Sequence, residues 1–262
     1  MTQKIYQVDA FAEKVFTGNP AAVCPLDQWM SDDLLQKIAM ENNLAETAYY
    51  VRDGDQYQIR WFTPTVEVDL CGHATLASAY VLFNHENFTG NTIRFYSHRS
   101  GELTVTRNGD LLTLNFPTDK LEAVELTAEL AECFNTEPAL AFKGKTDYML
   151  VFEREDEIKN LIPHLDKISK LPARGVIVTA KGEEVDFVSR FFGPQSGIDE
   201  DPVTGSAHTT LVPYWAGQLG RQDLSAIQLS ARKGYLHCKY LNNRVEISGK
   251  GKLFLKGEIY ID

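Results

Sequence analysis

The sequence of 262 residues predicts an α+β fold with two similar domains, in each of which strands wrap around one central apolar helix. Three observations lead to this fold class. The length favours two domains, because a single domain most often has about 100–150 residues. Strand-like segments outnumber helix-like ones, and one helix-like segment is apolar almost all round, as is typical of a buried helix. A motif of the first half also recurs in the second half.

The recurring motif places an arginine, two aromatic residues and a proline ahead of a glycine that leads into a helix. Arg60–Pro64 (RWFTP) is echoed by Arg190–Pro194 (RFFGP), and Gly72–Thr75 (GHAT) is echoed by Gly205–His208 (GSAH). Both matches are roughly 130 residues apart, which is about half the chain. Two ordered matches at this offset predict a duplication, and therefore two pseudo-symmetric domains that face one another across a cleft.

The first half consists of short strands, one surface helix and one buried helix. Ser31 is a good N-cap for the surface helix, and Asp53-Gly54 and Asn108-Gly109 are turns that join strands into hairpins. The expected strands are Ile5–Phe11, Ala21–Cys24, Thr47–Val51, Tyr57–Phe62, Thr92–Ser97, Glu102–Arg107 and Leu111–Phe116, and the buried helix is His73–His85.

The second half repeats this organisation after a boundary segment, Pro117–Asn135, which combines a linker with a helix. We therefore expect one domain over residues 1–118 and another over residues 119–262. A second buried helix begins near Ser206. The expected strands are Tyr148–Glu153, Gly175–Lys181, Glu184–Phe192, Ile227–Arg232, Tyr235–Leu241, Arg244–Lys250 and Leu253–Ile261.

Composition excludes several classes of protein. The chain has 26 basic and 36 acidic residues and a net charge of −10, which argues against a nucleic-acid binder and against an electrostatic membrane anchor. The charged N-terminus has no secretory signal, and the longest nearly apolar stretch, Leu76–Phe83, is too short to span a bilayer. The four scattered cysteines are typical of reduced thiols. We expect a cytoplasmic protein that binds neither nucleic acid nor membrane.

The two expected helix starts are candidates for binding an anion. Gly72-His73 and Gly205-Ser206 each stand where free backbone N–H groups and the positive end of the helix dipole would meet a carboxylate. A single glycine would more simply permit a tight turn. The matched pair favours a site.

Two carboxylates could supply acid–base chemistry. Glu46 stands between apolar neighbours at the entry to a strand, where burial would raise the pKa of its carboxyl toward neutrality and suit it to proton transfer, although such a residue is ordinarily a surface charge. Asp201 is held extended by Pro202 just before the second helix. It would either orient His73 or a substrate amine, or cap the helix.

Two other arrangements are not supported. Ser206 and His208 lack the GxSxG elbow of a hydrolase and would not face one another on one helix. Asp69, His73 and His208 lack HExxH or similar spacing, so no metal site is expected.

Six blocks of sequence follow one another along the chain: Asp9–Phe11, Phe16–Pro20, Glu46–Ala48, Phe62–Val68, Cys71–Thr75 and Asp201–His208. Together they resemble the PhzF-like family of phenazine-biosynthesis isomerase-like proteins, which has the diaminopimelate-epimerase-like fold. The resemblance implies two pseudo-symmetric domains, each with a barrel-like sheet around a central helix, and an active site in the cleft between them.

The resemblance also implies an activity, which is the cofactor-independent isomerisation of trans-2,3-dihydro-3-hydroxyanthranilate by transfer of a proton between carbons. The catalytic glutamate of the family matches Glu46. The substrate would be a small, amine-bearing carboxylate, the enzyme would need no cofactor or metal, and the chain would form a homodimer. The assisting residues implied are His73, Asp201 and Ser206, and the substrate-binding residues are Asn19, Gly72 and Gly205.

Two alternatives stay open. Related epimerases use one cysteine from each domain; Cys71 matches the first, but Thr204 occupies the second place and cannot form a thiolate. A two-thiol mechanism is therefore disfavoured, whereas an amino-acid epimerase with Cys71 and Glu46 on opposite faces of the substrate is conceivable. A non-catalytic protein that binds a small molecule in the same cleft is the other alternative.

Overall fold

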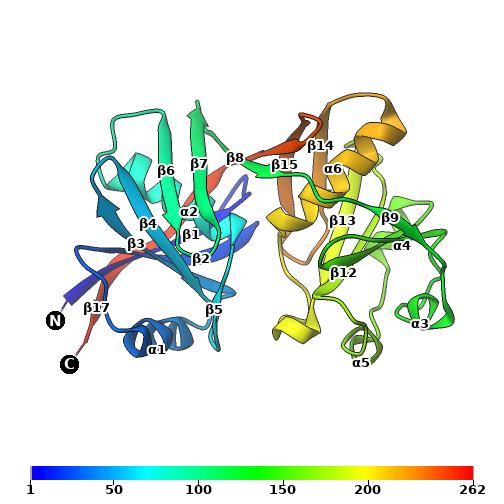
Figure 1. Cartoon of the computed structure of the whole chain (residues 1–262), viewed down its shortest axis with the longest axis horizontal. Coiled ribbons are helices and arrows are strands. Elements are labelled where there is room, and N and C mark those ends of the chain that lie inside the picture. Colours follow the sequence, from blue (N-terminus) through cyan, green and yellow to red (C-terminus); the bar gives the residue numbers. More distant parts are fainter. Residues whose placement is uncertain (1, 262) are drawn as a thin grey trace. The chain divides into compact units, whose positions relative to one another are not determined.

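The computed structural model describes residues 2–261, which form two compact units (Figure 1). The first unit comprises the chain up to Asn115 together with the residues from Ser248 onward, and the second unit comprises Phe116–Ile247. Each unit combines a mixed sheet with one long buried helix, which confirms the α+β fold class.

The sheet of the first unit has the strand order β17-β1-β2-β3-β4-β6-β7-β8. Strands β2 and β3 pair in parallel, as do β4 and β6, and their connections carry the helices α1 and α2. The other neighbouring pairs in this order are antiparallel. The elements are β1 (Thr2–Ala10), β2 (Asn19–Leu26), α1 (Asp32–Asn42), β3 (Glu46–Asp53), β4 (Gln56–Phe62), β5 (Glu67–Val68), α2 (Gly72–His85), β6 (Thr92–Ser97), β7 (Gly101–Asn108), β8 (Leu111–Pro117) and β17 (Gly251–Tyr260).

The second unit repeats this topology in the order β9-β10-β11-β12-β13-β14-β15-β16. Its parallel pairs are β11 with β12 and β13 with β14, at the positions equivalent to those of the first unit. The elements are β9 (Glu122–Val124), α3 (Ala128–Ala131), β10 (Leu140–Lys143), β11 (Asp147–Val151), α4 (Glu155–Lys159), α5 (Leu165–Ile168), β12 (Gly175–Lys181), β13 (Phe187–Phe192), the 3₁₀ turn η1 (Pro194–Ser196), α6 (Gly205–Leu219), β14 (Asp223–Gln228), β15 (Gly234–Tyr240) and β16 (Arg244–Gly249). The repeated order of parallel and antiparallel pairs confirms the duplication.

The C-terminal strand belongs to the first unit, whereas the sequence placed it in a domain over residues 119–262. Strand β17 pairs antiparallel with β1 from one end to the other, so the first and last strands of the chain lie side by side (Figure 1). The pairing gives β1 a second hydrogen-bonded neighbour and covers what would otherwise be an exposed edge. The division near residue 118 is close to the observed one, at Asn115, but the first unit is built from both ends of the chain.

The long helices α2 and α6 are the buried helices of the two units. Helix α2 packs against β1, β2 and β3, and helix α6 packs against β14 and β15. Both are mostly buried, and Leu76 and Leu211 are fully enclosed. Among residues 2–261, no helix is both long and apolar enough to cross a bilayer.

The repeated arginines make the same ion pair in both units. Arg60 at the end of β4 holds Glu67 of β5 in a bidentate pair, with 2.7 Å from Nε to Oε1 and 2.9 Å from Nη2 to Oε2. Arg190 on β13 holds Glu200 with the same two atom pairs, also at 2.7 and 2.9 Å. Each guanidinium lies over the ring two residues later, Phe62 or Phe192. The pair ties each strand to the segment that leads into the buried helix.

Candidate active site

Three segments bring their ends together at one edge of the first sheet. Because β2 and β3 are parallel, their first residues, Asn19 and Glu46, lie at the same edge. The buried helix α2 also begins here, with Gly72, after Cys71 in the N-cap position. Side chains from four separate positions in the sequence therefore converge.

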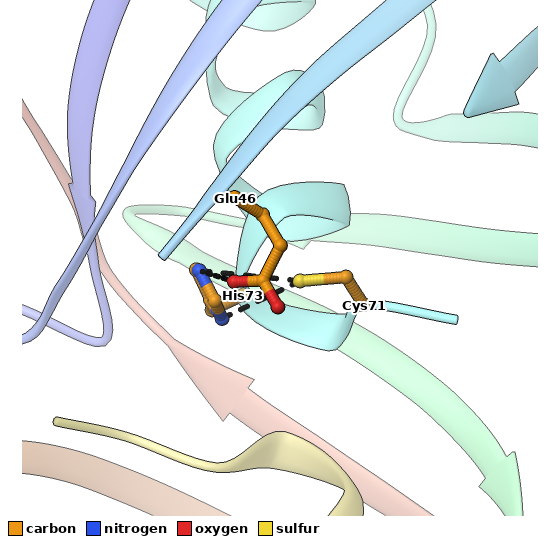
Figure 2. Close-up of side chains that lie close together, drawn as sticks. All are labelled: Glu46, Cys71 and His73. Carbon is orange, nitrogen blue, oxygen red and sulfur yellow. Dashed lines mark hydrogen bonds and ion pairs between the residues drawn. The ribbon is translucent and has the colours of Figure 1, made fainter. Parts of the chain in front are cut away.

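Glu46 and His73 form the centre of this cluster. The Nε2 atom of His73 lies 3.2 Å from Oε2 of Glu46, and the two side chains are 5% and 12% exposed (Figure 2). The Nδ1 atom lies 3.2 Å from the Asn19 amide nitrogen. Because an amide nitrogen only donates, Nδ1 accepts, and the proton of a neutral ring resides on Nε2, the ring nitrogen that lies next to Glu46. Burial lowers the pKa of His73 to about 3, which keeps the ring neutral.

The thiol of Cys71 lies beside the Glu46–His73 pair, which its position in the sequence did not indicate. Its Sγ atom is 3.5 Å from Nδ1 and 3.9 Å from Nε2 of His73, and the thiol points toward the Glu46–His73 pair (Figure 2). Ligand-type atoms of Glu46, Cys71 and His73 all lie within 4.8 Å of one another. Of these three residues, the resemblance assigned catalytic roles to Glu46 and His73. The thiol is a third member that the sequence left as an alternative.

The start of α2 can accept a negative charge beside this cluster. No side chain caps the helix, and its first turn holds no acidic residue. The first N–H groups of any helix have no partner within the helix, and the dipole places a partial positive charge there. Gly72, the first helical residue, has no side chain to shield these groups from a bound carboxylate.

The equivalent place in the second unit is a buried network at the start of α6. Asp201 Oδ2 accepts a hydrogen bond of 2.5 Å from the hydroxyl of Thr204, the N-cap residue. Gln228 joins the two, because its amide nitrogen donates to the Asp201 carbonyl (2.7 Å) and its amide oxygen accepts from the Thr204 N–H (2.8 Å). The Asp201 carboxylate is thus bound to the side chain of the N-cap residue, and that side chain accepts no hydrogen bond from the first helical N–H groups. Gly205 begins the helix, and the half-buried Ser206 lies in its first turn.

Comparison with known proteins identifies the family. A family model described as phenazine biosynthesis-like protein matches residues 8–257. The chain belongs to the phenazine biosynthesis-like (PhzC-PhzF) family. An uncharacterized isomerase from Pseudomonas aeruginosa is 52% identical over 262 residues, with both chains fully covered, and a human phenazine biosynthesis-like domain-containing protein is 36% identical with 99% of each chain covered.

Solved structures agree with this membership. A PhzF-family phenazine biosynthesis protein from Enterococcus faecalis superposes with a TM-score of 0.97 at 46% identity, with both chains fully covered. A hydroxyproline epimerase from Agrobacterium vitis shares only 9% identity, with a TM-score of 0.60 over 98% of this chain and 92% of its own, and therefore shares the fold alone. The fold predicted from the resemblance is confirmed.

Gln228 was missed by the sequence analysis. It is 1% exposed and lies at the end of β14, which begins four residues earlier than the strand expected from Ile227 onward. A glutamine at a strand end carries no local signal of burial. Its role follows only from the parallel pairing of β13 with β14, which places it beside the start of α6.

His208 has a structural role in this PhzF-family chain and does not pair with Ser206. It is fully buried, and its Nδ1–H donates to the Thr204 carbonyl over 2.9 Å. Its Nε2 atom has no hydrogen-bond partner within residues 2–261, and the ring packs near Phe187. Burial lowers the pKa of His208 to about 4.

Burial of neutral His208 makes stability depend on pH. Between an unfolded pKa of about 6.5 and the native value of about 4, the unfolded chain binds the proton and the native chain does not, so the free energy of unfolding falls as the pH falls through this window. The loss is on the order of 3 kcal/mol. We expect His208→Asn, which keeps the donor to Thr204, to have a flatter profile in urea titrations from pH 4 to 7. Parallel profiles for both proteins would contradict the assignment.

Proposed function

We propose that the chain is a cofactor-independent isomerase or epimerase that moves a proton between carbons of a small, amine-bearing carboxylate similar to dihydro-hydroxyanthranilate. The observation that carries the proposal is the Glu46 carboxylate held 3.2 Å from the His73 ring in a mostly buried place. Relatives that are named uncharacterized isomerases and match over the full length support it.

Glu46 is the proton carrier in this mechanism. One carboxylate oxygen lies 3.2 Å from Nε2 of His73, and this contact holds the carboxylate in place. The other oxygen takes a proton from a substrate carbon and returns it to a second carbon, so no net proton is gained or lost. The electron pair left on the substrate is delocalised toward its carboxylate, where N–H groups at the start of α2 stabilise the developing charge.

The spacing of Cys71 argues against the amino-acid epimerase alternative. Two bases on opposite faces of a carbon must each approach to about 3 Å, which separates them by about 6 Å. Ligand-type atoms of Cys71 and Glu46 lie within 4.8 Å. This spacing is shorter than two opposed bases require, so the proposal gives the proton transfer to Glu46 alone.

The second unit contributes Asp201, Gly205 and Ser206 in this proposal. The equivalence of the starts of α2 and α6 supports the assignment, because both helices begin at a glycine without a capping side chain. Asp201 and Ser206 would orient the amine or hydroxyl of the substrate, and the N–H groups after Gly205 would bind a carboxylate.

Solvent deuterium exchange tests the proposed function. The purified protein is incubated in D2O with dihydro-hydroxyanthranilate and a panel of amino and hydroxy acids, and the substrate carbons are followed by NMR. We expect deuterium at a carbon of a carboxylated substrate with the wild type and not with Glu46→Gln. Tight binding of a panel compound without exchange would favour the binding-protein alternative instead.

We expect His73 to contribute to the reaction by positioning the Glu46 carboxylate. Glutamine can place its amide nitrogen near the position of Nε2, whereas asparagine reaches only the position of Nδ1. We therefore expect His73→Gln to retain roughly tenfold more exchange activity than His73→Asn, with similar KM values, because only glutamine keeps an N–H group facing Glu46. Equal losses in both variants would show that the ring itself, rather than an N–H group beside Glu46, is required.

A further inference from the structure

We infer that Glu46, Cys71 and His73 form a binding site for a zinc-like divalent ion, and that occupation of the site blocks the proton transfer. One carboxylate, one thiol and one imidazole meet at a single place from the start of β3 and the start of α2 (Figure 2). The ion would be an inhibitor rather than a resident cofactor.

The distances within this cluster are close enough for side-chain rotation to bring three ligands to one tetrahedral ion. With metal bonds of about 2.0 Å to nitrogen and oxygen and about 2.3 Å to sulfur, two ligands of a tetrahedral zinc ion lie about 3.3–3.6 Å apart. His73 Nε2 is 3.2 Å from Glu46 Oε2 and 3.9 Å from Cys71 Sγ, which lies nearer Nδ1, at 3.5 Å. The third pair lies within 4.8 Å, and rotation of the Glu46 and Cys71 side chains brings all three ligand atoms to one ion at Nε2. Three protein ligands leave one coordination position for water or for substrate.

The ligand types select the class of metal. A thiolate with an imidazole favours borderline and soft ions such as Zn²⁺ and Co²⁺, whereas Mg²⁺ and Ca²⁺ require oxygen ligands. Binding would release the thiol proton of Cys71 to solvent. The sequence predicted no metal site, because the candidate ligands considered were Asp69, His73 and His208, whereas the ligands proposed here are residues 46, 71 and 73 of the first unit.

Asn19 can accept the hydrogen bond that a metal-bound imidazole donates from its other ring nitrogen. With Nε2 on a metal, the ring proton moves to Nδ1 and must be accepted. The Asn19 amide lies 3.2 Å from Nδ1, and a half-turn of the amide replaces its nitrogen by its oxygen. One side chain can therefore support the ring in both the metal-free and the metal-bound form.

Metal binding would inhibit the proton transfer, because it would occupy the Glu46 carboxylate that acts as the base. A metal-bound Glu46 carboxylate no longer accepts a proton from carbon. This consequence depends on the proposed function, but the binding of the ion does not. The two are tested separately.

Cobalt absorption tests binding without any substrate. Tag-free protein is titrated with Co²⁺, and we expect one ion per chain, d–d bands of tetrahedral intensity and a thiolate-to-cobalt charge-transfer band, all removed by excess Zn²⁺. Cys71→Ser should lose the charge-transfer band. Glu46→Gln should keep it but bind Co²⁺ at least about tenfold more weakly. Cys133→Ser, a matched change at a buried thiol that donates to the Glu129 carbonyl, should behave as the wild type.

Two results would overturn the inference. A cobalt spectrum without a thiolate band, or one that survives Cys71→Ser, would place the ion elsewhere. For the inhibitory role, Zn²⁺ should abolish the deuterium exchange of the wild type, and a chelator should restore it. If the exchange rate is unchanged with zinc bound, the inhibitory role is refuted but the metal site is not. If the metal-free protein shows no exchange, that result counts against the proposed function and not against the metal site.

Discussion

Replacement of Glu46 by glutamine is expected to lower the rate of substrate deuterium exchange by about a thousandfold, within the range that general acid–base catalysis contributes. Glutamine has the same shape, and its amide oxygen can take the place of the carboxylate oxygen that lies 3.2 Å from Nε2 of His73 in the wild type. The amide cannot take a proton from carbon. The fold and the substrate affinity should therefore change little while the chemical step is lost.

Replacement of Glu46 by aspartate tests whether the position of the carboxylate matters as well as its presence. Glu46→Asp keeps the base but withdraws it by about 1 Å, which should cost roughly a hundredfold and leave it between the wild type and Glu46→Gln. Glu132→Gln removes an exposed carboxylate of the second unit that pairs with Lys167 and should have no effect. Exchange within tenfold of the wild type in Glu46→Gln, together with loss of exchange in Cys71→Ala, would assign the base to the thiol.

Local sequence patterns predicted those features that depend on neighbouring residues. The strands Thr92–Ser97 and Gly175–Lys181 have the expected bounds, because alternating or continuous β-branched and aromatic residues favour a strand wherever the strand pairs. The buried helices were expected from their apolar surfaces, and both begin within one residue of the expected place. The duplication could be recognised in the sequence because Arg60 and Arg190 stand in similar motifs, and each makes the same ion pair in its own unit.

Features that depend on distant residues could not be predicted in this way. Nothing in Gly251–Tyr260 indicates that this strand pairs with β1 rather than with its neighbours in sequence. The contact of Cys71 with His73 depends on the extended backbone of the N-cap residue, which turns the thiol toward the ring. Burial of Gln228 depends on the choice of strand partner. Each is a consequence of tertiary pairing, which selects among local conformations of similar energy.

Replacement of Arg190 by methionine is expected to lower the free energy of unfolding of the second unit by about 3 kcal/mol. The guanidinium is 12% exposed and makes two bonds to Glu200, while Nη1 donates to the Ile158 and Leu161 carbonyls at 3.1 and 2.8 Å. Methionine fills much of the volume but leaves these acceptors without their donor. Urea unfolding followed by hydrogen exchange resolves the unit in which the loss occurs.

The equivalent change in the first unit should cost less, although the two ion pairs have the same geometry. Glu67 is also bound by Arg99 Nη2 at 2.9 Å, so Arg60→Met leaves that carboxylate with a cationic partner. Arg154→Met, in an exposed pair with Glu157, should change stability by no more than about 0.5 kcal/mol.

A double-mutant cycle tests whether the Arg190–Glu200 pair itself is responsible. Because removal of either partner leaves the other without its counter-charge, Glu200→Leu should cost at least about 1 kcal/mol less in the Arg190→Met background than in the wild type. Strictly additive losses would mean that Arg190 stabilises the unit through the two carbonyls alone. In that case the repeated arginine would be retained for its contacts to the backbone, and the shared ion pair would be incidental to the stability of either unit.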